Sequence, residues 1–229
     1  MLSAGAWALL AASSLVLGAW LAATFKISAR VVGEAMGFGA GALVSALAYE
    51  LIPHGSVSDL DIWLSFGVGA ITFFVIDGIL ERRTGGGSPG QAIALGALLD
   101  GIPESIVLGI SIAVGGSVTV GFLAAVFVSN IPEALSATSE LKSDMSTRSV
   151  YRLWISIAVI SAIAGALGYA LANAMPSSDG HRVQAFAAGA VLTMLASSMM
   201  PEAFSEGGRR VALFTALGFA IAALLTTFD

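Results

Sequence analysis

Long apolar stretches separated by short polar breaks run through the whole sequence. Each stretch is about 20 residues long, the length that an α-helix needs to cross the hydrocarbon core of a bilayer. The breaks are too short to form separate domains, so we expect one polytopic membrane domain over residues 1–229. The pattern predicts about eight transmembrane helices, near residues 4–24, 33–53, 62–80, 91–114, 118–140, 151–174, 182–203 and 210–227.

Composition supports an all-α integral membrane protein. Apolar residues make up 57% of the chain and charged residues 11%, and the mean hydropathy is +0.91, which is more apolar surface than a soluble domain of this size can bury. The absence of cysteine excludes disulfides and thiolate metal sites. A thinly spread net charge of −5 argues against nucleic acid as a partner, and the bilayer is the expected one.

The distribution of basic residues predicts the orientation. If the N-terminus lies outside, nine of the ten lysines and arginines fall on the cytoplasmic side. Arg182 alone remains outside. Both termini are therefore expected to be extracytoplasmic, in the plasma (inner) membrane of a bacterium.

Two parts of the chain resemble each other. Residues 41–53 align with residues 189–201, from a shared glycine to a shared proline, and Trp7 in the first span is echoed by Trp154 in the sixth. Five spans separate the copies, and because five is odd the second copy enters from the opposite side. This predicts two inverted three-helix repeats around a central helix pair (3+2+3), an arrangement typical of transporters. The alternative is that small-residue packing patterns recur in any helix bundle.

The fourth and fifth spans carry carboxylates that a membrane helix does not normally tolerate. Asp100, Glu104 and Glu133 each oppose insertion by about 2.5 to 3.5 kcal/mol when ionised near the bilayer centre. Residues 100–104 and 129–133 also share an Ile-Pro-Glu ending. A bound cation is the simplest way to offset this cost.

Helix geometry groups these residues into one candidate metal site. Positions four apart share a helix face, which pairs Asp100 with Glu104 and Ser129 with Glu133. Asn130 stands next to Ser129 in the fifth span. We therefore expect a midplane site whose ligands include Asp100, Glu104, Ser129 and Glu133.

At these residues the chain resembles the ZIP (Zrt/Irt-like) family of divalent metal transporters. Pro103, Glu104, Pro132 and Glu133 match the proline and glutamate of the family's fourth- and fifth-span motifs, and Asn130 matches its usual Asn or Asp. The resemblance implies eight spans, two inverted repeats, and Glu104 and Glu133 as metal ligands, with Asn130 beside them as a further ligand of the site. It also implies that zinc is transported into the cytoplasm as substrate, with no resident cofactor and no enzymatic activity.

The chain departs from the family motif at Asp100, Gly101, Ser105 and Ser129, where the family usually has His, Asn, Gly and His or Gln. The loss of a side chain at position 101 favours one metal position over two. The remaining donors are all oxygen, which suits Mn²⁺ or Fe²⁺, whereas the Irving–Williams order favours zinc. We expect zinc first, with broad selectivity that includes Mn²⁺, Fe²⁺ and Cd²⁺.

Other readings remain open. The carboxylates could form a proton relay in a carrier or channel for another solute. An intramembrane enzyme is disfavoured because the chain lacks His-Glu-x-x-His and Gly-x-Ser-x-Gly motifs. Glu50, His54, Glu202 and Glu206 either line vestibules of the pathway or are interfacial residues that reach water. A second copy of the chain, forming a homodimer, is a further candidate partner.

Overall fold

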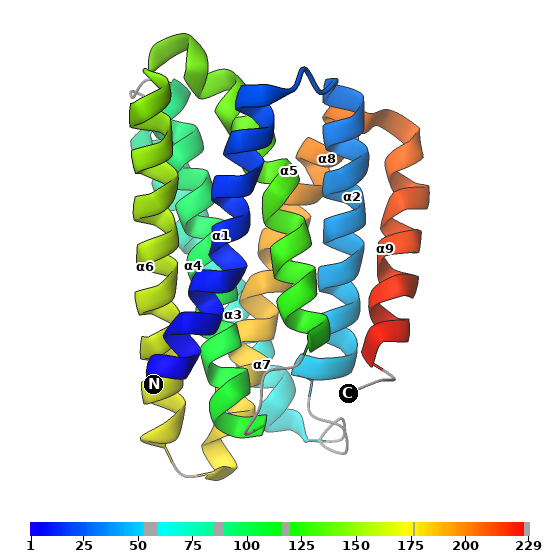
Figure 1. Cartoon of the computed structure of the whole chain (residues 1–229). Helices are drawn as coiled ribbons and strands as arrows, with labels where there is room; N and C mark the ends of the chain where they lie inside the picture. Colours follow the sequence, from blue (N-terminus) through cyan, green and yellow to red (C-terminus); the bar gives the residue numbers. More distant parts are fainter. Residues whose placement is uncertain (53–58, 85–88, 116–119, 176, 227–229) are drawn as a thin grey trace.

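The computed structural model describes the chain except residues 53–58, 85–88, 116–119, 176 and 227–229. In the described part, all regular structure is helical, and the helices form an elongated bundle (Figure 1). The elements are α1 (Leu2–Thr24), α2 (Ala29–Ala46), the π-helical turn η1 (Leu47–Leu51), α3 (Leu60–Thr84), α4 (Pro89–Gly115), α5 (Val120–Asp144), α6 (Thr147–Asn173), α7 (Ser177–Met194), the π-helical turn η2 (Leu195–Met199), α8 (Met200–Gly207), the 3₁₀ turn η3 (Gly208–Arg210) and α9 (Val211–Leu225).

Seven stretches of the described chain are long and apolar enough to cross a membrane. The last of them, Gly180–Leu225, has 46 residues and would be about 69 Å long if straight, roughly twice the hydrocarbon thickness. The chain folds back near Gly208, whose φ of 65° is readily adopted only by glycine. This stretch therefore holds both of the last two predicted spans, as two rods (Figure 1).

The predicted all-α class is confirmed, and the six earlier spans coincide with helices to within a few residues. The structure counts seven spanning stretches where the sequence predicted eight separate ones, because the helical turn η3 joins the last two without a non-helical residue between them. Helices of this length and composition are compatible with an integral membrane protein.

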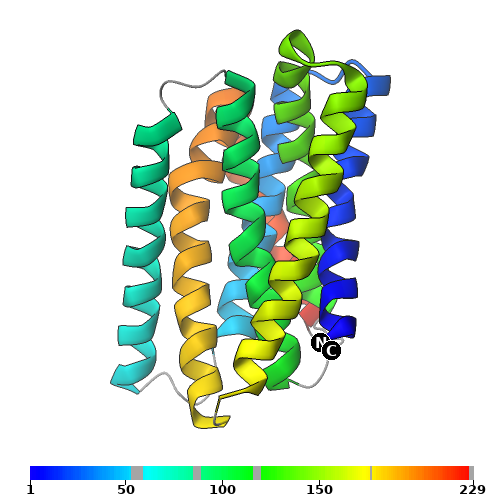
Figure 2. The same cartoon turned by 90° about the vertical axis from the view of Figure 1, so that its left-hand side faces the viewer.

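The two outer helices each pack mainly on one neighbour. α3 lies along α7 at one edge of the bundle (Figure 2), and α9 lies along α2 (Figure 1). α1 packs between α5 and α6, and α4 packs along α6. The helices α4 and α5, which carry the motif, therefore lie in the interior.

The α3–α7 and α2–α9 interfaces are closed by the same kind of contact. In each, a glycine of one helix lies directly against a backbone carbonyl of the other, so that no Cβ would fit. The pairs are Gly69 with Phe186 and Gly189 with Phe66 in the first interface, and Gly218 with Phe38 and Gly41 with Thr215 in the second.

The turns η1 and η2 continue α2 and α7 at their C-terminal ends with π-helical geometry. They begin at Leu47 and Leu195, which the alignment of residues 41–53 with 189–201 pairs with each other. Single π-helical turns are often found at functional sites. η2 is the turn that reaches the motif carboxylates.

Candidate metal site

The motif carboxylates lie on interior faces of α4 and α5. Asp100 is 7% exposed and Glu104 is 1% exposed, and Glu133 is mostly buried. Both helices continue through their internal prolines, Pro103 and Pro132. A proline removes one backbone hydrogen bond, which packed neighbouring helices make tolerable.

A small cavity of about 110 Å³ brings two of the predicted ligands together. Asp100 of α4 and Glu133 of α5 both line it, although they come from different helices. Glu202 of α8 lines the same cavity, so three helices contribute a carboxylate. The remaining lining residues are Gly96, Ala97, Ser136, Ala137, Glu140 and Ser198.

Two serines link the carboxylates into hydrogen-bonded groups. The hydroxyl of Ser198, in η2, donates to Oδ2 of Asp100 at 3.2 Å. The hydroxyl of Ser136 lies 2.9 Å from Oε1 of Glu202 and 3.3 Å from Oε1 of Glu206, and its single proton serves one of them at a time. Asp100 is therefore held in orientation from a second helix.

Among the motif carboxylates, Oε2 of Glu104 and Oε1 of Glu133 are buried and have no hydrogen-bond partner among the described residues. A buried, unsatisfied carboxylate oxygen costs several kcal/mol unless a cation or a proton compensates it. Glu104 does not line the cavity, but Glu104 and Glu133 both lie close enough to Asp100 to repel it electrostatically. When ionised, the three carboxylates would form a negative centre that favours a positive charge.

Ser129 and Asn130 lie elsewhere on α5. The Ser129 hydroxyl donates to the carbonyl of Val126 in its own helix at 3.0 Å, and Gly39 of α2 packs directly against the Ser129 backbone. Ser129 is thus at the α2–α5 contact. Asn130 is 3% exposed, and neither residue lines the 110 Å³ cavity.

The carboxylates do not form a ready metal cluster. Over the ranges that the structure describes, no three side chains of His, Cys, Asp or Glu are grouped so that they could hold one metal ion together. The cavity offers two carboxylates, Asp100 and Glu133, with the serine hydroxyls of Ser136 and Ser198 in the same lining. Such a donor set is all oxygen, which suits hard or borderline divalent cations and leaves coordination positions for water.

Glu50 has a structural contact that the sequence did not predict. Its carboxylate accepts a hydrogen bond from the backbone N–H of Phe122 at 3.0 Å, in the first turn of α5. A carboxylate there satisfies a helix-terminal donor and interacts favourably with the helix dipole. Its backbone carbonyl accepts from Nε2 of Gln184 at 3.2 Å, so Glu50 ties α2 to α5 and α7. His54 lies outside the described residues.

Sequence reasoning missed Ser136 and Ser198, because serine is common in membrane helices and neither residue belongs to a motif. One signal was present for Ser198. In the alignment of 41–53 with 189–201 it pairs with Glu50, another polar residue on an apolar helix. Comparison with known proteins adds no assignment: no family model matches the chain, and no curated protein is significantly similar to it.

Proposed function

We propose that the chain transports divalent transition-metal cations, zinc first, into the cytoplasm through the interior of the bundle. The observation that carries this proposal is the cavity shared by Asp100 and Glu133, two carboxylates from different helices inside an apolar bundle. A divalent cation between them would balance their charge and offset the cost of burying them.

The surrounding residues have distinct roles in this proposal. Asp100 and Glu133 bind the cation, while Ser198 holds the Asp100 carboxylate toward it, as hydrogen bonds to metal ligands generally do. Glu202 and Glu140 are more exposed and line the same cavity. They offer the next negative charges between the buried pair and water. Glu104, Ser129 and Asn130 remain proposed ligands for a conformation in which α4 and α5 approach each other differently.

We further infer that α1–α3 and α6–α9 are the two inverted repeats and that α4 and α5 are the central pair. The repeated glycine contacts and the paired π-helical turns support this. So do two ion pairs: Arg182 with Asp61 at 2.6 Å, and Arg210 with Glu34 at 3.9 Å. Arg182 and Glu34 lie equally far before Gly189 and Gly41, respectively. Asp61 and Arg210 likewise lie equally far before Gly69 and Gly218.

The two ion pairs therefore occupy equivalent positions with the acid and the base exchanged. Each joins the second helix of one repeat to the last helix of the other. Together with the distribution of basic residues, this supports an orientation in which Arg182 faces the outside and Arg210 faces the cytoplasm. Both chain ends are then extracytoplasmic, in a bacterial plasma membrane.

Glu133→Gln tests the proposal, because the amide keeps the side chain's shape and removes its charge. Protein in vesicles that enclose a metal-sensitive dye should lose Zn²⁺ uptake at limiting metal by at least about tenfold. Asp144→Asn is the matched control, since it removes an exposed carboxylate from the same helix and should leave uptake near normal.

Equal uptake by Glu133→Gln and Asp144→Asn would refute the site. Proton flux through the wild-type protein that does not depend on added metal, and that Glu133→Gln abolishes, would instead support the proton-relay carrier.

A further inference from the structure

An apolar cavity lies against a different face of α4 from the one that carries Asp100. Its volume is about 360 Å³, within the range of ligand pockets. It exists because α3 packs on α7 and makes few contacts with α4. Ile76 of α3, Leu99 and Pro103 of α4, and Ala187 of α7 are among its lining residues.

A second, more open cavity of about 450 Å³ continues the first toward one end of the bundle. The two share Leu171, Val183 and Phe186, so they form one groove along α3 and α7. The first part is lined almost entirely by apolar side chains. The second part includes Ser65 and Arg182, so the groove changes from apolar to polar along its length.

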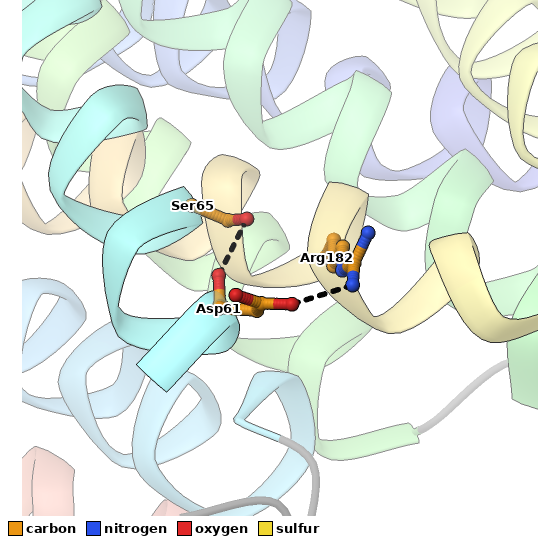
Figure 3. A network of polar contacts seen from close by, with 3 residues as sticks. All are labelled: Asp61, Ser65 and Arg182. Atoms are coloured by element: carbon orange, nitrogen blue, oxygen red, sulfur yellow. Dashed lines mark hydrogen bonds and ion pairs between the residues drawn. The ribbon is translucent and has the colours of Figure 1, made fainter. Parts of the chain in front are cut away.

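The polar end of the groove presents one acid and one base. Nη2 of Arg182 lies 2.6 Å from Oδ2 of Asp61, and the Ser65 hydroxyl donates to the Asp61 backbone carbonyl at 2.8 Å (Figure 3). The Arg182 and Asp61 side chains are 50% and 62% exposed. A guanidinium has five N–H donors and a carboxylate about four acceptor positions, so each can bind a second group while the pair remains.

We propose that this groove binds one phosphatidylethanolamine molecule from the surrounding bilayer. An acyl chain lies in the apolar cavity, the phosphate accepts from Arg182, and the ammonium donates to Asp61. A zwitterionic head group matches the paired charges, whereas the net charge of an anionic phospholipid is repelled by Asp61. The choline head group of phosphatidylcholine has no N–H to donate.

The bound acyl chain packs against α4, the helix that also carries Asp100. Leu99 and Pro103 line the apolar cavity, whereas Asp100 lines the 110 Å³ cavity with the carboxylates. The inference does not depend on metal transport. An equivalent apolar cavity between α2, α5 and α9 has only about 140 Å³, although the Glu34–Arg210 pair joins α2 to the turn that precedes α9. That end of the molecule therefore provides an internal control.

The experiment is native mass spectrometry of protein released from nanodiscs that contain equal amounts of phosphatidylethanolamine, phosphatidylcholine and phosphatidylglycerol. The wild-type protein should retain one phosphatidylethanolamine. Ile76→Trp fills the apolar cavity and should lower retention by about tenfold. Val75→Trp is the matched control: Val75 is the adjacent residue, similarly exposed, and does not line the cavity.

Arg182→Gln should remove the preference for phosphatidylethanolamine, and Arg210→Gln should keep it. Thr72→Phe, which also fills the cavity, replaces Ile76→Trp if that variant does not elute as a folded protein. The proposal is overturned if both tryptophan variants retain the lipid equally. Equal retention of the three phospholipids by the wild-type protein also overturns it. So does a wild-type protein that retains only detergent or fatty acid.

Discussion

Asp100 is the carboxylate of the 110 Å³ cavity that accepts a hydrogen bond from η2. It accepts from Ser198 and lies near Glu104, Glu133 and Glu202. One hydroxyl from another helix therefore sets the direction of a side chain that has no other hydrogen-bond partner among the described residues. This makes Ser198 a positioning residue in the proposed site.

We expect Ser198→Ala to weaken Zn²⁺ binding by about tenfold, because losing a hydrogen bond to a metal ligand typically costs 10- to 100-fold in affinity. Ser197→Ala is the control, since the Ser197 hydroxyl donates to Met194 in its own helix. Isothermal titration calorimetry of both variants in detergent measures the difference. Equal affinities would show that Ser198 does not orient Asp100 for binding.

The residues of the candidate site were predictable only in part. Asp100 and Glu133 were found because carboxylates in apolar spans are costly, and they do share a cavity. Ser129 was assigned to the same face as Glu133 by helical spacing, yet it packs against α2. α5 is buried on several sides, so spacing alone could not show which face meets the cavity and which meets a neighbouring helix.

The packing of α3 on α7 depends on a few glycines. Gly189 lies against the carbonyl of Phe66, and Gly69 lies against the carbonyl of Phe186, so α3 and α7 approach at backbone distance. In a bilayer such close packing provides much of the attraction between helices. Gly67, two residues before Gly69 on α3, has nothing within 4 Å of the position of a Cβ.

Gly189→Ala should therefore destabilise the protein by about 1 to 3 kcal/mol, because the added methyl forces α3 and α7 apart. Gly67→Ala should leave stability unchanged or raise it, since alanine favours the helix by up to about 1 kcal/mol. Thermal unfolding in detergent, followed by circular dichroism, compares the two. A Gly189→Ala protein as stable as Gly67→Ala would contradict the close contact.

Hydropathy predicted the helices well because each spanning helix needs an apolar stretch as long as the bilayer is thick, and such stretches are easily seen in the sequence. It did not predict η1 and η2, since a π-helical turn depends on local hydrogen bonding that leaves the apolar pattern unchanged. It also did not show that the last two spans are joined directly by the short turn η3. That depends on the backbone of Gly208.

At the scale of the molecule, the proposed inverted repeats require that the two ion pairs lie on opposite sides of the membrane. The chain contains no cysteine, so single cysteines can be introduced without a background. Asp61→Cys and Arg182→Cys should react with a membrane-impermeant maleimide in intact cells. Arg210→Cys and Arg148→Cys should react only after the cells are permeabilised. Labelling of all four from one side would rule out the inverted arrangement.

The exchange of outer helices between the two halves has a consequence for biosynthesis. α3 finds its main neighbour in α7, and α2 finds one of its main neighbours in α9. About 90 residues separate the end of α3 from the start of α7, which a ribosome takes on the order of 5 to 20 s to translate. During that interval lipid or the insertion machinery has to cover the glycine face of α3. A product that stops after α5 would keep this face uncovered, so the first half of the chain is not a self-sufficient folding unit.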